Sequence, residues 1–354
     1  MRQNLTLKSM DKPEIELISR RDFVKYCGGL GFALLANPST SILDIIPNST
    51  PHLTMQLDWK YNVQFAGLLL ADYYGLYKQR GLKIEILPVN SDRNVFEQIA
   101  ENPLILGCGE QDAILAAQVQ GYPVKAIATM FQASPLGLMS IPEKNIHSLN
   151  DLVGQKVGIH GNTKKVMELI INTNDLSPQD IEIVPISYQD KYDRLQSREL
   201  AAVQCYSVDE PIGFSYKTGI KPNILKFSDY GYDAYVQVIF AHQQLLDHHS
   251  EWVNQFLKAS FAGWKLALDN INQTAKIVVD VYTKPDSQYH NLDYQTKSLQ
   301  LIADYLTCGI NPEQIGYISA NRWQEMSEKL AQYGIIDRVP SLTDSLDSSL
   351  WLVA

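Results

Sequence analysis

The sequence predicts an α/β protein of two lobes joined by a hinge of two crossing strands. At 354 residues the chain is long enough to bury two cores. Strand and helix patterns alternate over residues 55–130 and again over residues 154–227, as they do in sheets covered by helices. A Pro- and Gly-containing break separates the two series, and helical patterns return after the second. One lobe interrupted by another predicts a hinged molecule.

The first strand–helix–strand unit lies within residues 55–89. Met55 and Leu57 alternate with polar residues, an apolar helical stripe ends at Gly81, and an apolar strand follows it. Such a unit is a right-handed βαβ crossover. The turn at 58–62 then lies at the carboxyl end of the first strand, where open α/β sheets bind small ligands.

The remaining patterns fill both lobes. In lobe one we expect helices at 92–100 and 111–120 and strands at 104–107 and 124–130, which makes a four-stranded lobe. In lobe two we expect strands at 154–161, 181–186, 201–206 and 224–227, with helices at 163–172, 191–197 and 210–218. Strands at 138–141 and 235–241 would cross between the lobes. A long amphipathic helix is expected at 251–268, and helices at 274–283, 293–306 and 322–333 would pack on lobe one. The expected boundaries are 1–50 for a signal and linker, 51–137 with 238–340 for lobe one, 138–237 for lobe two and 341–354 for a C-terminal tail.

Composition and charge exclude some functions. The net charge is -9 with no basic cluster beyond the N-terminus, so we expect no nucleic-acid partner. The 19 tyrosines favour an aromatic ligand, because each offers a stacking face and a hydroxyl. Beyond the N-terminal segment the chain holds Cys108, Cys205 and Cys308, an odd and widely spaced set that argues against a disulfide framework or a zinc site.

The N-terminus carries an export pattern. Residues 19–25, Ser-Arg-Arg-Asp-Phe-Val-Lys, match the twin-arginine pattern S-R-R-x-F-x-K at every defined position. The apolar run at 26–36 is diluted by glycine and is too short for a permanent membrane span. We therefore expect export to the periplasm by the twin-arginine route, with cleavage between Ala36 and Thr50. Cys27 lacks a lipoprotein context.

Candidate ligand-binding residues lie at the strand ends and helix starts that face the cleft between the lobes. Helix starts present free backbone N–H groups, which favour acceptors and anions. The carboxylate of Glu210 suits the amine and ring nitrogen of an aminopyrimidine or the imide edge of a flavin, and its alternative role is to stabilise a helix dipole. Trp59 is likewise either a stacking surface or a core residue. The candidates are Asp58, Trp59, Asn62, Phe65, Glu110, Gln111, Asn162, Thr163, Tyr188, Glu210, Tyr232 and Tyr235.

Several of these residues form motifs that resemble a known family. The pattern Asp58-Trp59-x-x-Asn62, the run Gln64-Phe65-Ala66-Gly67 and a helix ending Gly-Leu-Tyr-x-x-x-Gly-Leu resemble periplasmic substrate-binding proteins of ABC importers. The group is the one that binds thiamine-pyrimidine precursors, riboflavin, sulfonates and nitrate. Residues 151–158 resemble its D-L-x-G-K-K-V-G entry to lobe two, and Asp209-Glu210-Pro211 resembles its N-E-P segment. The resemblance covers roughly residues 53 to 335.

The resemblance implies a type II periplasmic-binding-protein clamshell that binds a small aromatic heterocycle between its lobes. Its partners would be a membrane permease and a separate ATPase subunit, because this chain has no GxxxxGK[ST] motif. The expected ligand is a thiamine-related aminopyrimidine, followed by riboflavin or a flavin precursor and then by a sulfonate or nitrate. We expect a monomer without a cofactor, a metal or catalytic residues, and the histidines 242, 248 and 249 are expected at the surface.

One enzyme alternative shares this fold. Eukaryotic thiamine-pyrimidine synthases resemble the chain through residues 121–124 and 256–259. Those enzymes consume their own active-site histidine and carry a CCCFC run. The matching position of the histidine here is near Ala113, and the cysteine run falls near residues 231–235, so neither element is present. The binding-protein interpretation is therefore preferred.

Export gives a direct test of the N-terminal pattern. Replacing Arg20 and Arg21 together by Lys should leave the protein in the cytoplasm, because the route recognises the arginine pair. Cell fractionation measures this, and Lys25→Arg serves as a control that keeps the pair. A doubly substituted protein that still reaches the periplasm would contradict the twin-arginine interpretation.

Overall fold

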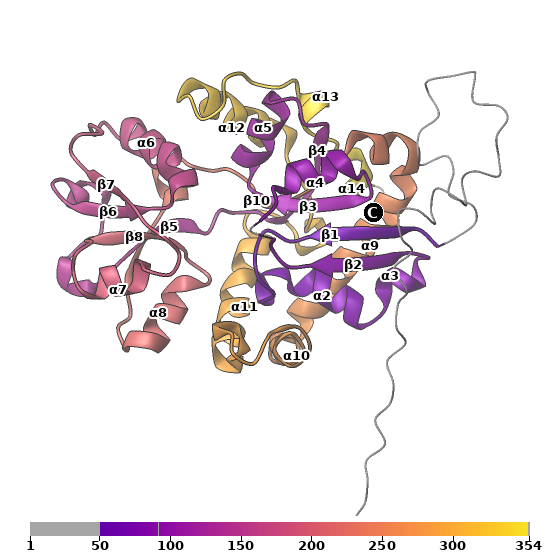
Figure 1. Ribbon diagram of the computed structural model, residues 1–354, viewed down its shortest axis with the longest axis horizontal. Coiled ribbons are helices and arrows are strands. Elements are labelled where there is room, and N and C mark those ends of the chain that lie inside the picture. Colours follow the sequence, from indigo (N-terminus) through magenta and orange to yellow (C-terminus); the bar gives the residue numbers. More distant parts are fainter. Residues whose placement is uncertain (1–49, 91, 353–354) are drawn as a thin grey trace, which may run out of the picture. The chain divides into compact units, whose positions relative to one another are not determined.

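The computed structural model describes residues 50–90 and 92–352. The twin-arginine pattern, the apolar run and Cys27 therefore lie outside the described residues. The described part is a mixed α/β structure with two five-stranded sheets (Figure 1), which confirms the predicted fold class. We call the first sheet and its covering helices lobe one and the second sheet and its covering helices lobe two. No helix of the described part is both long and apolar enough to cross a membrane.

Lobe one is built on the sheet order β2-β1-β3-β10-β4. The strands are β1 (His52–Gln56), β2 (Lys83–Leu87), β3 (Ile105–Gly109), β4 (Val124–Phe131) and β10 (Val236–His242). β1 pairs in parallel with β2 and β3, whereas β10 is antiparallel to both β3 and β4. The predicted four-stranded lobe thus gains a fifth strand, because the returning chain inserts between β3 and β4. Its first helices are η2 (Val63–Phe65), α2 (Ala66–Tyr73), α3 (Leu76–Gln79), α4 (Val95–Glu101) and α5 (Gln111–Val119).

Lobe two repeats the same topology with the order β7-β6-β8-β5-β9. The strands are β5 (Leu136–Ser140), β6 (Lys156–Ile159), β7 (Glu182–Pro185), β8 (Ala202–Tyr206) and β9 (Asn223–Lys226). Its α-helices are α6 (Lys164–Thr173), α7 (Lys191–Gln196) and α8 (Glu210–Thr218), and its short 3-10 helices are η3 (Pro142–Lys144), η4 (Leu149–Leu152), η5 (Gly161–Thr163) and η6 (Phe227–Tyr230). Again one strand, β5, runs antiparallel between its neighbours β8 and β9.

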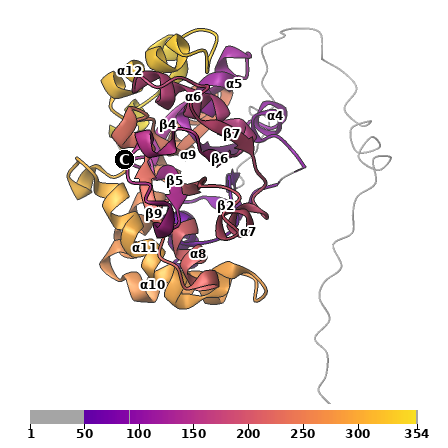
Figure 2. The ribbon, with the colours of Figure 1, turned by 90° about the vertical axis from the view of Figure 1, so that its left-hand side faces the viewer.

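Helices dominate the C-terminal third. They are α9 (Gln243–Asp269), α10 (Ile271–Ile277), a π-helical turn η7 (Val278–Tyr282), η8 (Gln288–His290), α11 (Leu292–Thr307), η9 (Pro312–Gln314), α12 (Ala320–Gln332), α13 (Leu342–Ser345) and α14 (Ser349–Leu352). Helices α9 and α10 pack on α2 in lobe one, as expected for α10. Helix α11 differs from the expectation, because it contacts η2 of lobe one and also lies beside α8 of lobe two (Figures 1 and 2).

Three further expectations need correction. The strands predicted to cross between the lobes each belong to one sheet, since all partners of β5 are in lobe two and all partners of β10 are in lobe one. The first helix is broken, because Gly75 adopts a left-handed conformation (φ 67°) between α2 and α3. The expected C-terminal tail packs on lobe one, where the Asp347 N–H donates to the Ala126 carbonyl (2.8 Å) and Asn254 donates to the Leu350 carbonyl (2.9 Å).

Helices α2 and α9 cross at two glycines. A Cβ atom on Gly67 would lie 2.2 Å from Cγ of Trp264, and one on Gly263 would lie 2.0 Å from the Gly67 carbonyl oxygen. Trp264 is fully buried in the core of lobe one at this crossing. The absence of both side chains therefore sets how closely the helix after the first strand can approach α9.

The close approach of the two helices predicts that a methyl group added at Gly263 destabilises the protein. Gly263→Ala should lower the free energy of unfolding by about 1–3 kcal/mol, because the new methyl meets backbone atoms that have no rotamer with which to move away. Chemical denaturation measures the change, and Leu266→Ala, at an exposed position of the same helix, should change stability little. Equal stability of Gly263→Ala and the parent would show that the two helices can separate at no cost.

Candidate functional site

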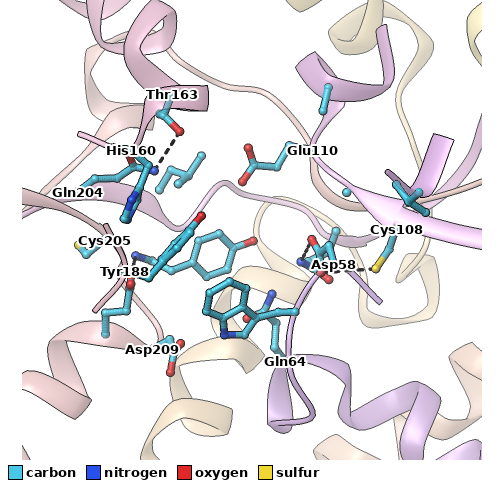
Figure 3. A pocket seen from close by; sticks show the side chains of 18 of the residues that line it. Asp58, Gln64, Cys108, Glu110, His160, Thr163, Tyr188, Gln204, Cys205 and Asp209 are labelled. Atoms are coloured by element: carbon cyan, nitrogen blue, oxygen red, sulfur yellow. Dashed lines mark hydrogen bonds between the residues drawn. The ribbon is translucent and has the colours of Figure 1, made fainter. Parts of the chain in front are cut away.

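A cavity of about 270 Å³ lies between the lobes (Figure 3). Lobe one contributes Asp58, Trp59, Gln64, Val95, Phe96, Cys108, Gly109, Glu110, Ala113 and Gln237. Lobe two contributes Leu136, His160, Thr163, Tyr188, Lys191, Gln204, Cys205, Tyr206, Asp209 and Glu210. Most of these residues stand at or just after the carboxyl ends of β1, β3, β6, β7 and β8. The parallel strands of both lobes therefore end at one cleft, as the general rule for open α/β sheets requires.

The structure brings part of the predicted set together. The predicted residues that line the cavity are Asp58, Trp59, Glu110, Thr163, Tyr188 and Glu210. Trp59 of lobe one and Tyr188 of lobe two meet across the cleft with ring centroids 4.9 Å apart, and Tyr188 stacks on His160 at 3.9 Å. Tyr188 is half exposed, so this aromatic pair lies at the edge of the cavity. The side chain of Asn162 lies outside the described part of the structure.

Other predicted residues lie outside the lining because they support the fold. Asn62 caps η2, its Oδ1 accepting from the Gln64 N–H (2.6 Å), and Phe65 is fully buried in the core of lobe one. Gln111 donates to the Trp323 carbonyl (2.9 Å) and accepts from the Tyr235 N–H (3.1 Å), which ties α5 to β10 and α12. These side chains follow strand ends, as predicted, but point away from the cleft.

The two predicted tyrosines near β10 are also structural. Tyr232 is fully buried in a core to which both lobes and α12 contribute. The Tyr235 hydroxyl accepts from the Ser319 N–H (3.0 Å), and the Arg322 guanidinium lies 4.0 Å from the centre of its ring. Both residues thus stabilise the segment that returns the chain to lobe one, and neither lines the cavity.

Asp58 is held by two residues of lobe one. Its Oδ2 accepts from Nε2 of Gln237 (2.9 Å), and Sγ of Cys108 lies 3.6 Å from its Oδ1. Burial raises the pKa of Asp58 from 3.8 to about 6, although both hydrogen bonds oppose the shift. Gln237 has a left-handed backbone (φ 54°), which is strained for a residue with a side chain. No sequence pattern indicated Gln237, because its segment has the pattern of an ordinary strand.

Glu110 is an unpaired carboxylate. It follows β3, and Figure 3 shows its side chain directed toward His160 and Tyr188 of lobe two. It forms no hydrogen bond or ion pair with any residue in the described part of the chain. Burial raises its pKa well above the ordinary value, and the nearby carboxylates of Asp112 and Asp58 raise it further. N–H groups of a ligand would favour the ionised form of this carboxyl group, because that form accepts their hydrogen bonds.

His160 presents a second open acceptor. Its Nδ1 lies 3.2 Å from the Ile186 carbonyl, which can only accept, so Nδ1 carries the proton and Nε2 keeps a lone pair. Nε2 is buried and has no hydrogen-bond partner among the described residues. Burial, followed by the positive charge of Lys191, lowers the pKa of His160 to about 4, so the ring is neutral near pH 7. Sequence reasoning missed His160, although it directly precedes the predicted helix start.

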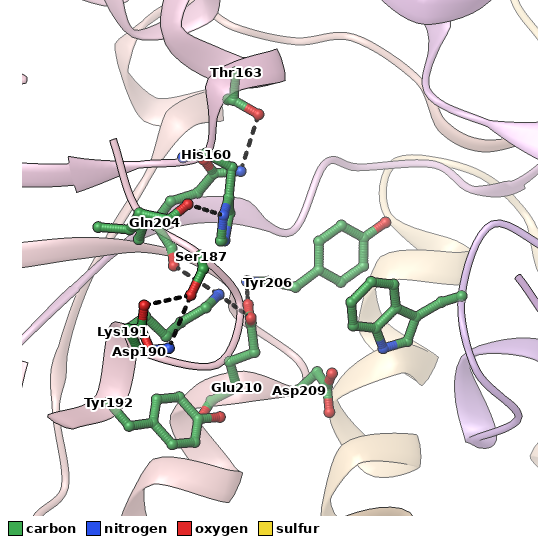
Figure 4. Close-up of polar contacts among 12 residues, drawn as sticks. His160, Thr163, Ser187, Asp190, Lys191, Tyr192, Gln204, Tyr206, Asp209 and Glu210 are labelled. Atoms are coloured by element: carbon green, nitrogen blue, oxygen red, sulfur yellow. Dashed lines mark hydrogen bonds and ion pairs between the residues drawn. The ribbon is translucent and has the colours of Figure 1, made fainter. Parts of the chain in front are cut away.

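Glu210 is already engaged within lobe two (Figure 4). Its Oε1 pairs with the buried ammonium of Lys191, and its Oε2 accepts from the Tyr206 N–H (2.6 Å). Lys191 also donates to the Gln204 carbonyl (3.3 Å). Glu210 therefore fixes the turn between β8 and α8, and the role of carboxylate partner expected for it is better filled by Glu110.

Acceptors dominate the cavity as a whole. Its lining holds the carboxylates of Asp58, Glu110, Asp209 and Glu210, against the single ammonium of Lys191, which is paired. Two further buried polar groups of the lining, the Tyr206 hydroxyl and Oε1 of Gln237, form no hydrogen bond of good geometry within the described chain, although the two side chains interact. In native structures such atoms are rare and usually meet a ligand or water. No group of three or more His, Cys, Asp or Glu residues in the described range is arranged to hold a metal ion.

Comparison with known proteins identifies the family. Residues 62–273 match the NMT1/THI5-like family, and the chain belongs to it. It is 23% identical to riboflavin-binding protein RibY of Chloroflexus aurantiacus over 300 residues, which cover 82% of this chain and 84% of that protein. It is also 28% identical over 135 residues to the 4-amino-5-hydroxymethyl-2-methylpyrimidine phosphate synthase of Legionella pneumophila. That match covers 38% of this chain and 43% of the synthase.

Solved structures share the fold. The periplasmic aliphatic sulphonate binding protein SsuA from Escherichia coli superposes with a TM-score of 0.64 at 13% identity, over 85% of this chain and 93% of that chain. The ligand-binding component of an ABC-type import system from Staphylococcus aureus, with zinc bound, gives a TM-score of 0.62 at 17% identity, over 85% and 98%. These similarities show that the fold is that of type II periplasmic binding proteins.

The raised pKa of Asp58 predicts how stability depends on pH. Because the folded-state pKa is about 6 and the ordinary value is 3.8, the contribution of Asp58 to stability is complete below pH 3.8 and is lost as pH rises through 6. Asp58→Asn should therefore gain stability relative to the parent between pH 4 and pH 7, by up to about 3 kcal/mol.

Chemical denaturation of both ligand-free proteins at pH 4 and pH 7 measures this change. The matched control is Asp151→Asn, because backbone and Ser148 hydrogen bonds lower the pKa of that exposed carboxylate. The transition of that group lies below its ordinary pKa of 3.8, so the stability of this variant relative to the parent should differ little between pH 4 and pH 7. A stability difference between Asp58→Asn and the parent that is constant with pH would contradict the burial of an ionisable Asp58.

Proposed function

We propose that the protein is the extracytoplasmic solute-binding component of an ABC importer and that its ligand is a small flat heterocycle rich in N–H donors, such as a thiamine-related aminopyrimidine. The observation that carries the ligand class is the unpaired Glu110 side chain, which is directed toward His160, a residue whose Nε2 also lacks a partner among the described residues. An aminopyrimidine offers an exocyclic amine to such acceptors and a ring face to Trp59 and Tyr188. Ligand binding between two lobes would bias an open–closed equilibrium.

The charge of the cavity separates this ligand from the anions. Sulfonate and nitrate present acceptors only and carry negative charge, whereas the lining presents carboxylates and one ammonium that is already paired. Placing an anion beside Glu110 and Asp58 would add like-charge repulsion in a poorly solvated site. Similarity of the fold to a sulphonate-binding protein therefore does not extend to the chemistry of this cavity.

Riboflavin is the second candidate ligand. The extended match to riboflavin-binding protein RibY favours it. However, the cavity of about 270 Å³ falls below the range of roughly 300–1,000 Å³ that drug-sized ligands occupy. A three-ring flavin with its sugar chain would require the lobes to open, whereas a single pyrimidine ring fits the present volume.

The cavity lacks the histidine that the synthase alternative would require near position 113. Ala113, the position near which the synthases carry their consumed histidine, lines the cavity with a methyl group. The family relatives named as synthases match less than half of this chain. Transport also agrees with the proposed twin-arginine export, which would place a monomeric protein in the periplasm beside a permease whose ATPase is another chain.

Calorimetry and thermal shift of the purified protein test the proposal. We expect reversible binding of 4-amino-5-hydroxymethyl-2-methylpyrimidine, one molecule per chain, with a stabilisation of about 2.7 kcal/mol at 100 times the dissociation constant. Glu110→Gln should weaken this binding by about 1.5–3 kcal/mol, because a charge-assisted hydrogen bond is lost. The exposed Glu97→Gln, outside the lining, should leave affinity unchanged.

The same binding measurements are made with riboflavin, ethanesulfonate and nitrate. Tighter binding of riboflavin would replace the proposed ligand by the second candidate. Binding of ethanesulfonate that Glu110→Gln strengthens would show that the cavity is an anion site and would refute the proposal. Conversion of a histidine, detected by mass spectrometry after incubation with pyridoxal phosphate, iron and oxygen, would instead establish the synthase alternative.

A further inference from the structure

Asp209 is a lining residue whose carboxylate is directed away from the charged pair beside it. Figure 4 shows its side chain turned from Lys191 and Glu210. Its two oxygens accept from two tyrosines that come from outside lobe two: the Tyr289 hydroxyl donates to Oδ2 (3.0 Å), and the Tyr294 hydroxyl donates to Oδ1. Only 7% of Asp209 and 2% of each tyrosine are exposed. Hydrogen bonds this deeply buried are costly to break.

The same chain of hydrogen bonds reaches Trp59. The indole Nε1–H of Trp59 donates to the Tyr289 hydroxyl (2.7 Å), and that hydroxyl uses its own proton for Asp209. Trp59 belongs to the first turn of lobe one and Asp209 to lobe two, so one tyrosine in η8 connects the two lobes. An indole nitrogen is a donor only, and a carboxylate is an acceptor only, so the direction of the chain is fixed from end to end.

Helix α11 holds this connection in place. Its Gln295 accepts from the Val63 N–H of lobe one (2.9 Å), while Ser298, one turn further along the helix, donates to the Val208 carbonyl of lobe two (2.5 Å). Tyr305 extends the lobe-two face with a hydrogen bond to Ser207 (2.8 Å). Tyr294, Ser298 and Tyr305 are spaced by four and seven residues and therefore share one side of the helix. The helix thus keeps Asp209 within reach of both tyrosines.

We propose that Asp209 is a positioning residue for Trp59: through Tyr289 it fixes the orientation of the indole ring only when lobe two is docked, so the stacking surface for the ligand is completed by closure of the lobes. The proposal rests on the proposed function in that Trp59 serves as the stacking surface. When the lobes separate, Asp209 leaves Tyr289, and the Trp59 indole loses the partner that defines its rotamer. A ligand that stacks on Trp59 then favours the docked state.

Fluorine NMR of the full-length protein labelled with 5-fluorotryptophan tests this coupling without a ligand. The chain has five tryptophans, and Trp59→Phe assigns the resonance of Trp59. Asp209→Ala should displace that resonance although no contact joins the two side chains directly. Tyr289→Phe should displace it too, and the double variant should displace it no further than Tyr289→Phe alone, because the chain is already cut.

The matched control is Tyr305→Phe. It removes the hydrogen bond from α11 to Ser207 of lobe two, which lies two positions before Asp209 in the sequence. The hydrogen bonds that connect Asp209 through Tyr289 to Trp59 stay intact. It should leave the Trp59 resonance in place. If it displaces that resonance as far as Asp209→Ala does, general loosening of the lobes is the cause and the proposal is overturned. A Trp59 resonance that responds to Tyr289→Phe but not to Asp209→Ala also overturns it, because the coupling then ends at Tyr289.

Asp209→Asn provides the same comparison if the alanine variant does not fold, since it keeps the shape and leaves one acceptor oxygen for two tyrosine donors. Asp209→Asn alone should displace the Trp59 resonance, and its combination with Tyr289→Phe should displace that resonance no further than Tyr289→Phe alone. Additive displacements would refute the proposal. Binding of 4-amino-5-hydroxymethyl-2-methylpyrimidine is a separate readout, expected to weaken about twofold to tenfold in Tyr289→Phe as ring orientation is lost. Failure of that compound to bind would count against the proposed function and would leave the resonance test decisive for the coupling.

Discussion

Strand β10 is the constraint on which both lobes depend. It lies between β3 and β4 and is antiparallel to both, so the first sheet is completed only after the chain has built lobe two and returned. The ladder to β4 shifts register between Ile239 and Phe240, and the second residue of the strand, Gln237, has a left-handed backbone. This irregular start places the Gln237 amide against Asp58. The strand that completes the sheet of lobe one therefore also shapes the cavity between the lobes.

The cavity carries an energetic cost that a purely structural interior would avoid. Burial raises the pKa of Asp58, Glu110 and Asp209, which means that each ionised carboxylate is less stable here than in water. Asp209 is offset by two tyrosine donors and Glu210 by Lys191, but Glu110 has no partner among the described residues. Unpaired polar groups gathered in one cleft are typical of binding sites, where stability is exchanged for affinity.

Communication between the lobes runs through the C-terminal helices as well as through the connecting segments. Helix α11 contacts lobe one by Gln295 and lobe two by Ser298, and η8 supplies Tyr289 between Trp59 and Asp209. A two-lobe binding protein needs docked and separated states of similar free energy. Opening must break these buried hydrogen bonds and also separate apolar side chains of the two lobes that share one core, and water can replace the lost hydrogen-bond partners.

The sequence by itself determined the order and type of the elements, the two-lobe class and the location of the site at the carboxyl ends of the parallel strands. These follow from local periodicity and from the general topology of α/β sheets, so α6, predicted at 163–172, is found at Lys164–Thr173. Only the tertiary structure decided which side chains at those ends face the cleft. The side chains of Gln111 and Tyr235 form hydrogen bonds within the fold that connect α5 and the start of β10 to the region of α12. His160, Asp209 and Gln237 line the cavity instead. The physical reason is that the direction of a side chain beyond a strand end depends on partners far away in the chain, such as Tyr289 for Asp209, which no local pattern records.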